Sequence, residues 1–150
     1  MRVFAQQDFQ TILGLNTELI NNIIDTPVLI YKLVINKSKP NIYGEATKKV
    51  YYTPVLVPCI FSRVNTVSVE KVGTIDIEQQ SQFAFLRQQL INQNIYPERG
   101  DVIEYDNSYY EIENAIEVQL FAGQVAYNLQ VLCDTHLMRT EPTQLQRPIV

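Results

Sequence analysis

The sequence predicts a mainly β protein, an antiparallel β-barrel or sandwich with one or two short helices and extended terminal arms. Three observations predict this class. Several segments alternate apolar and polar residues, as strands with one buried face do. Turn residues separate these segments, as at Asp106-Asn107-Ser108, where asparagine tolerates the left-handed backbone of a tight hairpin. Nine tyrosines and six phenylalanines, with no tryptophan, also favour strands.

Length and composition predict the organisation of the chain. We expect 150 residues, 46% of them hydrophobic, to fold as a single β domain over 1–150. No apolar run reaches the roughly 18 residues of a membrane span, and residues 1–6 lack the apolar core of a signal peptide. We therefore expect a cytosolic chain without a membrane partner. Cys59 and Cys133 lie in apolar runs and are predicted to be buried free thiols, since a disulfide between them would need an oxidising compartment.

The N-terminal part predicts an arm, a helix, a strand and a loop. Residues 1–15 carry scattered apolar positions and are interpreted as an N-terminal arm, either a short helix or a segment laid on a neighbour. Asn16 or Thr17 can then cap a short helix that ends at residues 25–27. We expect this helix to face the core, and the alternative is a helix that docks onto a partner. Its apolar stripe is Leu19, Ile20, Ile23 and Ile24. Residues 28–35 predict a buried strand, and residues 36–49 a long basic loop.

Two prolines mark the extended run over residues 50–63. Pro54 and Pro58 have no N–H to donate to a sheet, and residues four apart in a strand point their N–H groups to the same side. We therefore expect one side of this strand to be an unpaired edge. The amides of Val55 and Val57 should point to the other side and pair with a neighbouring strand.

The second half of the chain predicts more strands and one short helix. The β pattern continues over 67–78, with a bulge expected at Gly73, and a strand ending near Phe85 precedes a helix over about 86–92. A hairpin over 97–118, a strand over 125–134 and a loose tail over 139–150 complete the chain. One core is expected to gather Val55, Val57, Ile103, Tyr105, Ile112, Ile116, Leu129 and Val131.

The charge is unevenly placed along the sequence. Residues 28–71 hold seven basic and two acidic residues, which gives +5, whereas residues 98–118 hold seven acidic and one basic residue, which gives −6. Such asymmetry can steer one molecule onto another, unless folding intermixes the two sets. The candidate interaction residues are the loop lysines Lys37, Lys39, Lys48 and Lys49, and the acidic face of the hairpin, Glu111, Glu113 and Glu117.

A search for catalytic patterns finds none. His136 is the single histidine, and Cys133, three residues away, points to the other face of a strand. The sequence has neither zinc-ligand spacing nor a glycine-rich phosphate loop, and the three glutamates are interpreted as a solvated strand face. We therefore expect no enzyme, no cofactor and no metal site. Abundant amides, 14 glutamines and 11 asparagines, suit a surface that makes repeated protein contacts.

Five short motifs follow one another along the chain. They are Ile42-Tyr43-Gly44-Glu45, Lys49-Val50-Tyr51-Tyr52, the run Tyr96 to Tyr105, Tyr109-Tyr110-Glu111-Ile112 and Cys133-Asp134-Thr135-His136-Leu137. Together these motifs resemble the neck, or head-completion, proteins of tailed bacteriophages and their head–tail joining (stopper) proteins. The resemblance covers roughly residues 25–139.

The resemblance implies a small β-barrel or sandwich that assembles as a homo-oligomeric ring between portal and tail. The implied partners are the portal or adaptor, other neck proteins and the tail terminator or tail tube. Packaged DNA is a further candidate partner. The implied location is the neck of the virion, assembled in the host cytoplasm, with no catalytic residues. The alternative is a nucleic-acid-binding β-barrel module, because the basic loop lies beside Tyr43, Tyr51 and Tyr52; a pI near 5 argues against it.

Overall fold

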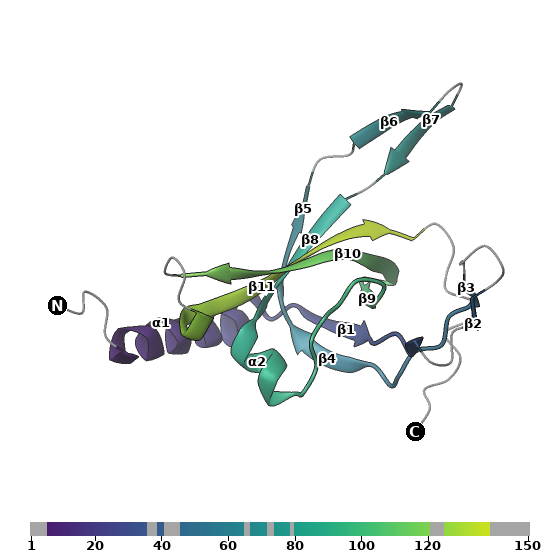
Figure 1. Ribbon diagram of the computed structural model, residues 1–150. Coiled ribbons are helices and arrows are strands. Elements are labelled where there is room, and N and C mark those ends of the chain that lie inside the picture. Colours follow the sequence, from purple (N-terminus) through teal and green to yellow (C-terminus); the bar gives the residue numbers. More distant parts are fainter. Residues whose placement is uncertain are drawn as a thin grey trace.

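A computed structural model of the chain describes residues 6–35, 39–40, 46–64, 67–71, 74–78, 80–120 and 125–138. The protein is mainly β, as predicted: a seven-stranded antiparallel open sheet carries an N-terminal helix and one short helix (Figure 1). The strand order in the sheet is β4-β1-β9-β10-β11-β8-β5. These strands are β1 Pro27–Tyr31, β4 Val55–Pro58, β5 Ile60–Arg63, β8 Gln80–Leu86, β9 Val102–Tyr105, β10 Ser108–Gln119 and β11 Asn128–Leu137.

Two small ribbons and the helices complete the described chain. The first ribbon pairs β2, Lys39–Pro40, with β3, Ala46–Lys48, inside the segment predicted as a loop. The second pairs β6, Val67–Lys71, with β7, Thr74–Glu78, and stands away from the main sheet in Figure 1. The helices are α1 Gln6–Glu18, the π-helix η1 Leu19–Ile24, α2 Arg87–Asn92 and the short 3-10 turn η3 Val125–Tyr127. Residues 1–5, Lys37, Gly73 and the tail 139–150 lie outside the described residues.

The sheet is rolled because one segment supplies both of its edges. The Cys59 N–H donates to the Thr26 carbonyl at 2.9 Å, so pairing with the β1 side continues to Cys59. From Ile60 onward the same segment pairs with β8 instead. Rolling brings the ring of Phe61 on β5 to 4.6 Å, centroid to centroid, from the ring of Tyr105 on β9. The expected barrel or sandwich is therefore one open sheet curled around its core.

Pro54 and Pro58 lie on the side of β4 that has no neighbouring strand among the described residues. Because Cys59 points its N–H at β1, Val55 and Val57 do the same, whereas Pro54, Leu56 and Pro58 face the other side. No described strand pairs with β4 on that other side, which makes β4 an edge of the sheet. The prediction of a proline-marked edge is confirmed for β4. It is wrong for residues 60–63 of the same run, because β5 pairs with β8 on the side that the prolines mark.

Hydrogen exchange should distinguish the two sides of β4. We expect slow exchange at the amides of Val55 and Val57, which face β1, and fast exchange at Leu56, which is 57% exposed and faces no described strand. Amide exchange followed by NMR measures all three in one experiment. Equal protection at the three amides would contradict the assignment of sides.

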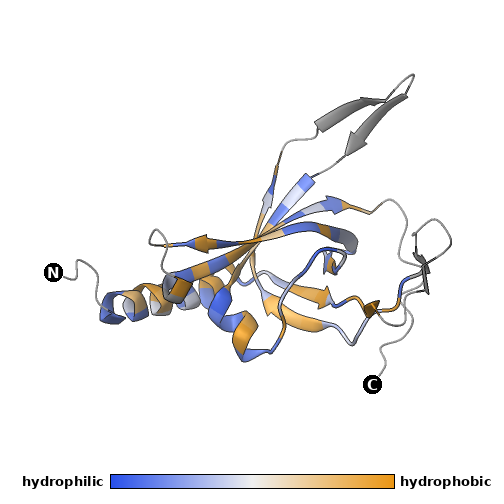
Figure 2. Ribbon diagram, in the orientation of Figure 1, coloured by the Kyte–Doolittle hydropathy of each residue, from blue (hydrophilic) through white to orange (hydrophobic). Residues whose placement is uncertain are grey.

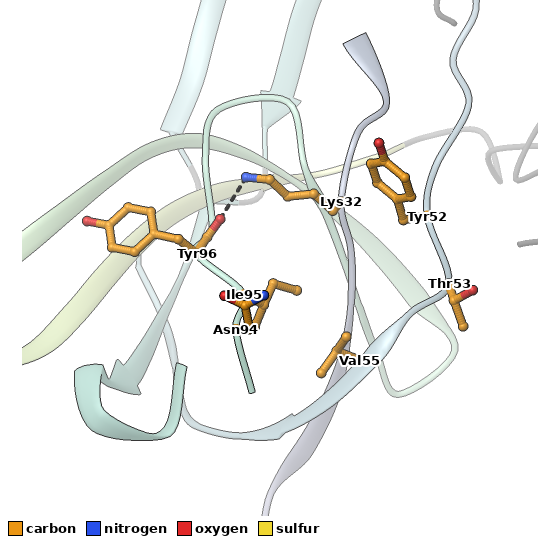
Figure 3. A pocket seen from close by; sticks show the side chains of 7 residues that line it. All are labelled: Lys32, Tyr52, Thr53, Val55, Asn94, Ile95 and Tyr96. Atoms are coloured by element: carbon orange, nitrogen blue, oxygen red, sulfur yellow. Dashed lines mark hydrogen bonds between the residues drawn. The ribbon is translucent and has the colours of Figure 1, made fainter. Parts of the chain in front are cut away.

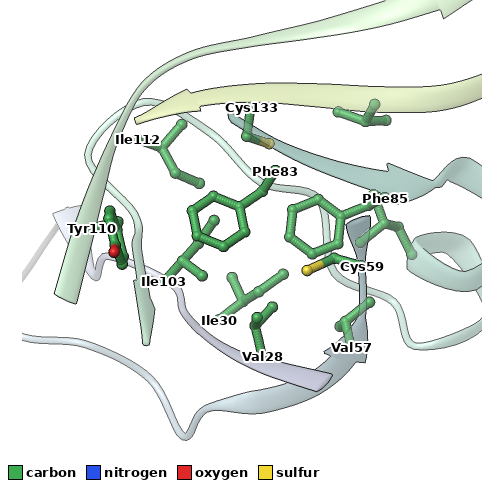
Figure 4. Packing of buried hydrophobic residues seen from close by; sticks show 12 residues of the cluster. Val28, Ile30, Val57, Cys59, Phe83, Phe85, Ile103, Tyr110, Ile112 and Cys133 are labelled. Carbon is green, nitrogen blue, oxygen red and sulfur yellow. The ribbon is translucent and has the colours of Figure 1, made fainter. Parts of the chain in front are cut away.

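The core lies inside the roll (Figure 4). It combines aliphatic residues of β1, β4, β9 and β10 with a cluster of aromatic rings. Of the predicted core, Val57, Ile103, Ile112 and Val131 are buried, and Val55 and Tyr105 pack against them. Both cysteines are buried free thiols, as predicted.

The core prediction is wrong for Ile116 and Leu129, because the pairing of β10 with β11 shifts its register next to each of them. Ile112 pairs with Thr135 but Asn114 pairs with Asp134, so Glu113 is an extra residue that inverts the alternation of β10. After this bulge Ala115 packs against the core, whereas Ile116 is 50% exposed. Leu129 is the extra residue of a second irregularity, in β11, and is only partly buried.

The helix prediction needs correction at its start. The helix begins at Gln6, and Asn16 and Thr17 lie in its interior rather than at a cap. The side chain of Asn16 donates to the Ile12 carbonyl at 2.8 Å, and that of Thr17 to the Leu13 carbonyl at 2.7 Å. The end is as predicted, because Asp25 adopts a left-handed backbone (φ 42°) and its N–H donates to the Ile20 carbonyl.

The later elements match the sequence more closely. β8 ends at Leu86, and α2 follows as predicted. The link between β9 and β10 is shorter than the predicted three residues, because Ser108 already belongs to β10. Asp106 and Asn107 both have positive φ angles, 48° and 56°, as a two-residue type I′ turn requires. The strand predicted over 125–134 begins only at Asn128, because Val125–Tyr127 forms η3, and it continues to Leu137.

Candidate interaction site

The predicted charged sets meet within the chain. Lys49 Nζ lies 2.8 Å from Glu111 Oε1, and Lys32 Nζ lies 2.8 Å from Glu98 Oε2. The contrast of +5 against −6 along the sequence is therefore partly neutralised by folding. Lys32 and Lys49 are engaged by carboxylates, which weakens the case for a continuous basic surface of the kind that binds nucleic acid.

The three glutamates do not share one face, because the bulge at Glu113 separates them. Glu111 binds Lys49, and Glu113 lies 2.9 Å from Nδ1 of His136. Glu117 accepts hydrogen bonds from the amide of Asn128 and the hydroxyl of Tyr96, and it pairs with Arg87 at 3.4 Å. The Asn128 amide is the main cause that lowers the pKa of Glu117, with smaller contributions from Tyr96 and Arg87. Each carboxylate has a structural partner of its own.

Lys39 and Lys48 are placed differently from Lys49. They are cross-strand partners in the β2–β3 ribbon, hereafter the basic ribbon. Lys37 lies outside the described residues.

A buried carboxylate fixes the segment that leads to the basic ribbon. Asp101 is 1% exposed and accepts from the backbone N–H groups of Leu33 (2.9 Å) and Glu98 (2.8 Å) and from Lys32 Nζ (3.1 Å). Burial raises the pKa of Asp101, and these three donors oppose that shift. Next to it, Gly100 has φ 93°, and a Cβ there would lie 3.3 Å from Leu33. The Leu33–Asp101 hydrogen bond joins residues 68 positions apart and could not be predicted from the sequence.

A pocket of about 220 Å³ lies between the start of β4 and the segment after α2 (Figure 3). Its lining is Lys32, Tyr52, Thr53, Val55, Asn94, Ile95 and Tyr96. The Lys32 ammonium donates to the Tyr96 carbonyl at 2.7 Å and is also bound by Glu98 and Asp101, so it is not free for an anion. Cavities of about 150 Å³ with apolar linings accept a benzene ring. The pocket can accept one aliphatic or aromatic side chain.

The N-terminal helix exposes apolar residues that the sequence interpretation assigned to the core or left unassigned. None of the described residues Gln6–Glu18 is buried, and in η1 only Ile20 is. Leu15, Leu19 and Ile23, spaced four residues apart, are 63%, 39% and 71% exposed. We call these three residues the helix stripe; Figure 2 shows apolar residues along α1. The sequence feature that could have indicated this exposed surface is that apolar residues between positions 9 and 24 fall on more than one side of the helix.

The thiols and the histidine do not form a reactive centre. Burial raises the pKa of both Cys59 and Cys133 to about 12, so both are protonated near neutral pH and are poor nucleophiles. Among the described residues, no group of three His, Cys, Asp or Glu side chains is placed to hold a metal ion. Within the same residues, no helix is both long and apolar enough to cross a membrane.

Comparisons with known proteins leave the family open. No protein-family model matches the chain, and no curated protein is significantly similar to it in sequence.

Proposed function

We propose that this protein is a structural subunit of the neck of a tailed bacteriophage, forming a ring between portal or adaptor and tail. In this role it retains packaged DNA in the head and docks the tail, without catalytic activity. The proposal starts from the motif series that resembles neck and stopper proteins.

The observation that carries the proposal is the convergence of these separate motifs on one structural unit. The motif that includes Lys49 and Tyr51 lies against the β9–β10 hairpin through the Lys49–Glu111 ion pair. The motif from Tyr96 to Tyr105 supplies Asp101, which binds the backbone of Leu33, and Leu33 in turn bridges to Tyr51. Motifs dispersed over about half of the chain thus form one packed region, which supports their interpretation as parts of one functional unit.

The surface also supports an assembly role. A ring needs two different patches of one subunit that fit each other. The helix stripe is an exposed apolar patch on the subunit, of the kind that such a contact can use.

Removing the gene from the phage should test the function directly. Heads made without this protein should package DNA but lose it or fail to join tails, because nothing seals the portal. Electron microscopy of the lysate and nuclease protection of head DNA measure both outcomes, with the gene supplied from a plasmid as the control. Infectious particles that lack the protein would overturn the proposal.

A further inference from the structure

The two strands of the β6–β7 ribbon pair only with each other among the described residues. The outer edge of each strand therefore faces no described strand, and the ribbon stands away from the seven-stranded sheet in Figure 1. An isolated two-stranded ribbon is only marginally stable in water, and three or more strands are needed for independent stability. An open strand edge also presents a row of backbone donors and acceptors that another strand can bind. The ribbon is thus a template for a further strand.

The open edge of β6 continues from β5. The Val64 N–H donates to the Gln80 carbonyl at 3.2 Å, so Ile60, Ser62 and Val64 direct their backbone groups toward β8. The residues between them direct theirs to the opposite side, where no described strand pairs with β5. β6 follows β5 in the chain and pairs with β7 in the antiparallel sense in which β5 pairs with β8. β5 and β6 therefore share one open edge, and β7 supplies the other.

The positions of the prolines distinguish these edges from that of β4. Pro54 and Pro58 remove donors from the open side of β4, which protects that edge against the addition of a strand. Between Ile60 and Leu86 the sequence has no proline, so the open edges of β5, β6 and β7 keep their backbone donors. One edge of the subunit is closed to strand addition, and the ribbon is open to it.

We propose that the β6–β7 ribbon joins neighbouring subunits, with β7 of one copy added as a strand to the open edge of β6 in a second copy. Recognition of this kind uses main-chain hydrogen bonds along a strand edge. Because β6 and β7 run in opposite directions, ribbons placed side by side in the same orientation form an antiparallel pair at every contact.

The presence of two open edges favours a second copy over a strand from a different protein. A single foreign strand would pair one edge and leave the other open, whereas copies of the same ribbon can pair both. The contact joins two different edges, so its repetition closes into a ring that leaves no edge open. The proposal rests on the connector function above and specifies the contact between its subunits.

A pair of variants tests the donors of the β6 edge. Lys71 pairs with Thr74 across a two-residue link, and the residues that flank such a turn are hydrogen-bonded to each other. Bonded and outward-facing residues alternate along an antiparallel strand. Glu70 and Ser68 therefore direct their N–H groups to the open edge. Ser68→Pro with Glu70→Pro removes both donors, and the matched control, Ser68→Ala with Glu70→Ala, keeps them.

The proline variant should associate more weakly than the alanine control. We expect its concentration for half-association, measured by analytical ultracentrifugation, to be about tenfold higher or more, because each lost hydrogen bond weakens the contact. Thermal unfolding followed by circular dichroism should show that both variants keep the main sheet. Equal association of the two variants would overturn the proposal, as would a wild-type chain that stays monomeric at its highest soluble concentration.

Cross-linking identifies which edges meet. One chain carries Glu70→Cys in β6 and another carries Ile75→Cys in β7, and the native thiols do not compete because both are 0% exposed. A short bis-maleimide should link the two different chains in higher yield than it links either chain to itself. Predominant linkage of the Glu70→Cys chain to itself would show that β6 pairs with β6, and this result, like the absence of mixed product, would overturn the contact.

The outcomes separate this interface from the proposed function. A phage that needs the protein but tolerates the proline variant keeps the connector and loses the ribbon contact. A chain that associates through the ribbon but is dispensable for infection keeps the contact and loses the connector.

Discussion

Replacing Ile112 with alanine should lower the free energy of unfolding by about 2–5 kcal/mol. Ile112 is 1% exposed and packs in the core beside Phe83 and Ile103. The smaller side chain loses apolar burial and leaves a cavity that the rolled sheet cannot easily fill. Urea unfolding followed by circular dichroism measures the change.

The same strand offers a matched control for this variant. Ile116 is the same residue type in β10, but it is 50% exposed because the bulge at Glu113 turns it outward. Ile116→Ala should change the free energy of unfolding by less than about 0.5 kcal/mol. Similar losses for the two variants would contradict the inversion of faces at the bulge.

Replacing Asp101 with alanine should cost about 3 kcal/mol or more. The carboxylate is buried, and its removal leaves the N–H groups of Leu33 and Glu98 without their acceptor and Lys32 without one of its three acceptors. The segment around Leu33, which leads from β1 to β2, should then be held less firmly against the start of β9. Thermal and urea unfolding measure the loss.

Two further variants separate charge from hydrogen bonding at this position. Asp101→Asn keeps one acceptor oxygen and should fall between wild type and Asp101→Ala. Glu98→Ala removes the other carboxylate on Lys32, but the Glu98 side chain is 61% exposed, so its loss should stay below about 1 kcal/mol. A loss as large as that of Asp101→Ala would show that the ion pairs of Lys32, rather than the buried acceptor, stabilise this region.

The sequence predicted those features of the fold that follow from local chemistry. Asp106 and Asn107 identified the turn of the β9–β10 hairpin, and the spacing of Pro54 and Pro58 identified the free side of β4. Each of these depends on backbone geometry within a few residues. The position of α2 was also predicted, because the spacing of apolar residues changes there from that of a strand to that of a helix.

Other features could not be predicted because they depend on contacts between distant residues. A single inserted residue, Glu113, leaves no mark in an apolar–polar pattern, yet it reverses every face that follows in β10. The Lys49–Glu111 pair spans 62 positions and converts two apparent interaction residues into an internal contact. The helix start at Gln6 was missed because Asn16 and Thr17 are as able to bind carbonyls inside a helix as to cap one.

The lysines of the loop were chosen as candidate interaction residues from charge alone. Only the fold shows that Lys49 is paired with Glu111 within the chain, whereas Lys48 lies opposite Lys39 in the β2–β3 ribbon. Leu19 and Ile23 were recognised as apolar residues of a helix but were assigned to the core in preference to a docking surface, because apolar residues at helical spacing indicate a core in most proteins. Only the fold shows which of them remain in contact with water.

The segment over residues 55–63 has a mechanical consequence. Since β4 and β5 are successive parts of one stretch of backbone, neither edge of the sheet can separate without displacing the other. The β6–β7 ribbon follows β5 directly and precedes β8, so tension applied to the ribbon reaches both edges through that stretch. A subunit built in this way resists peeling strand by strand and yields, under force, in a single cooperative step.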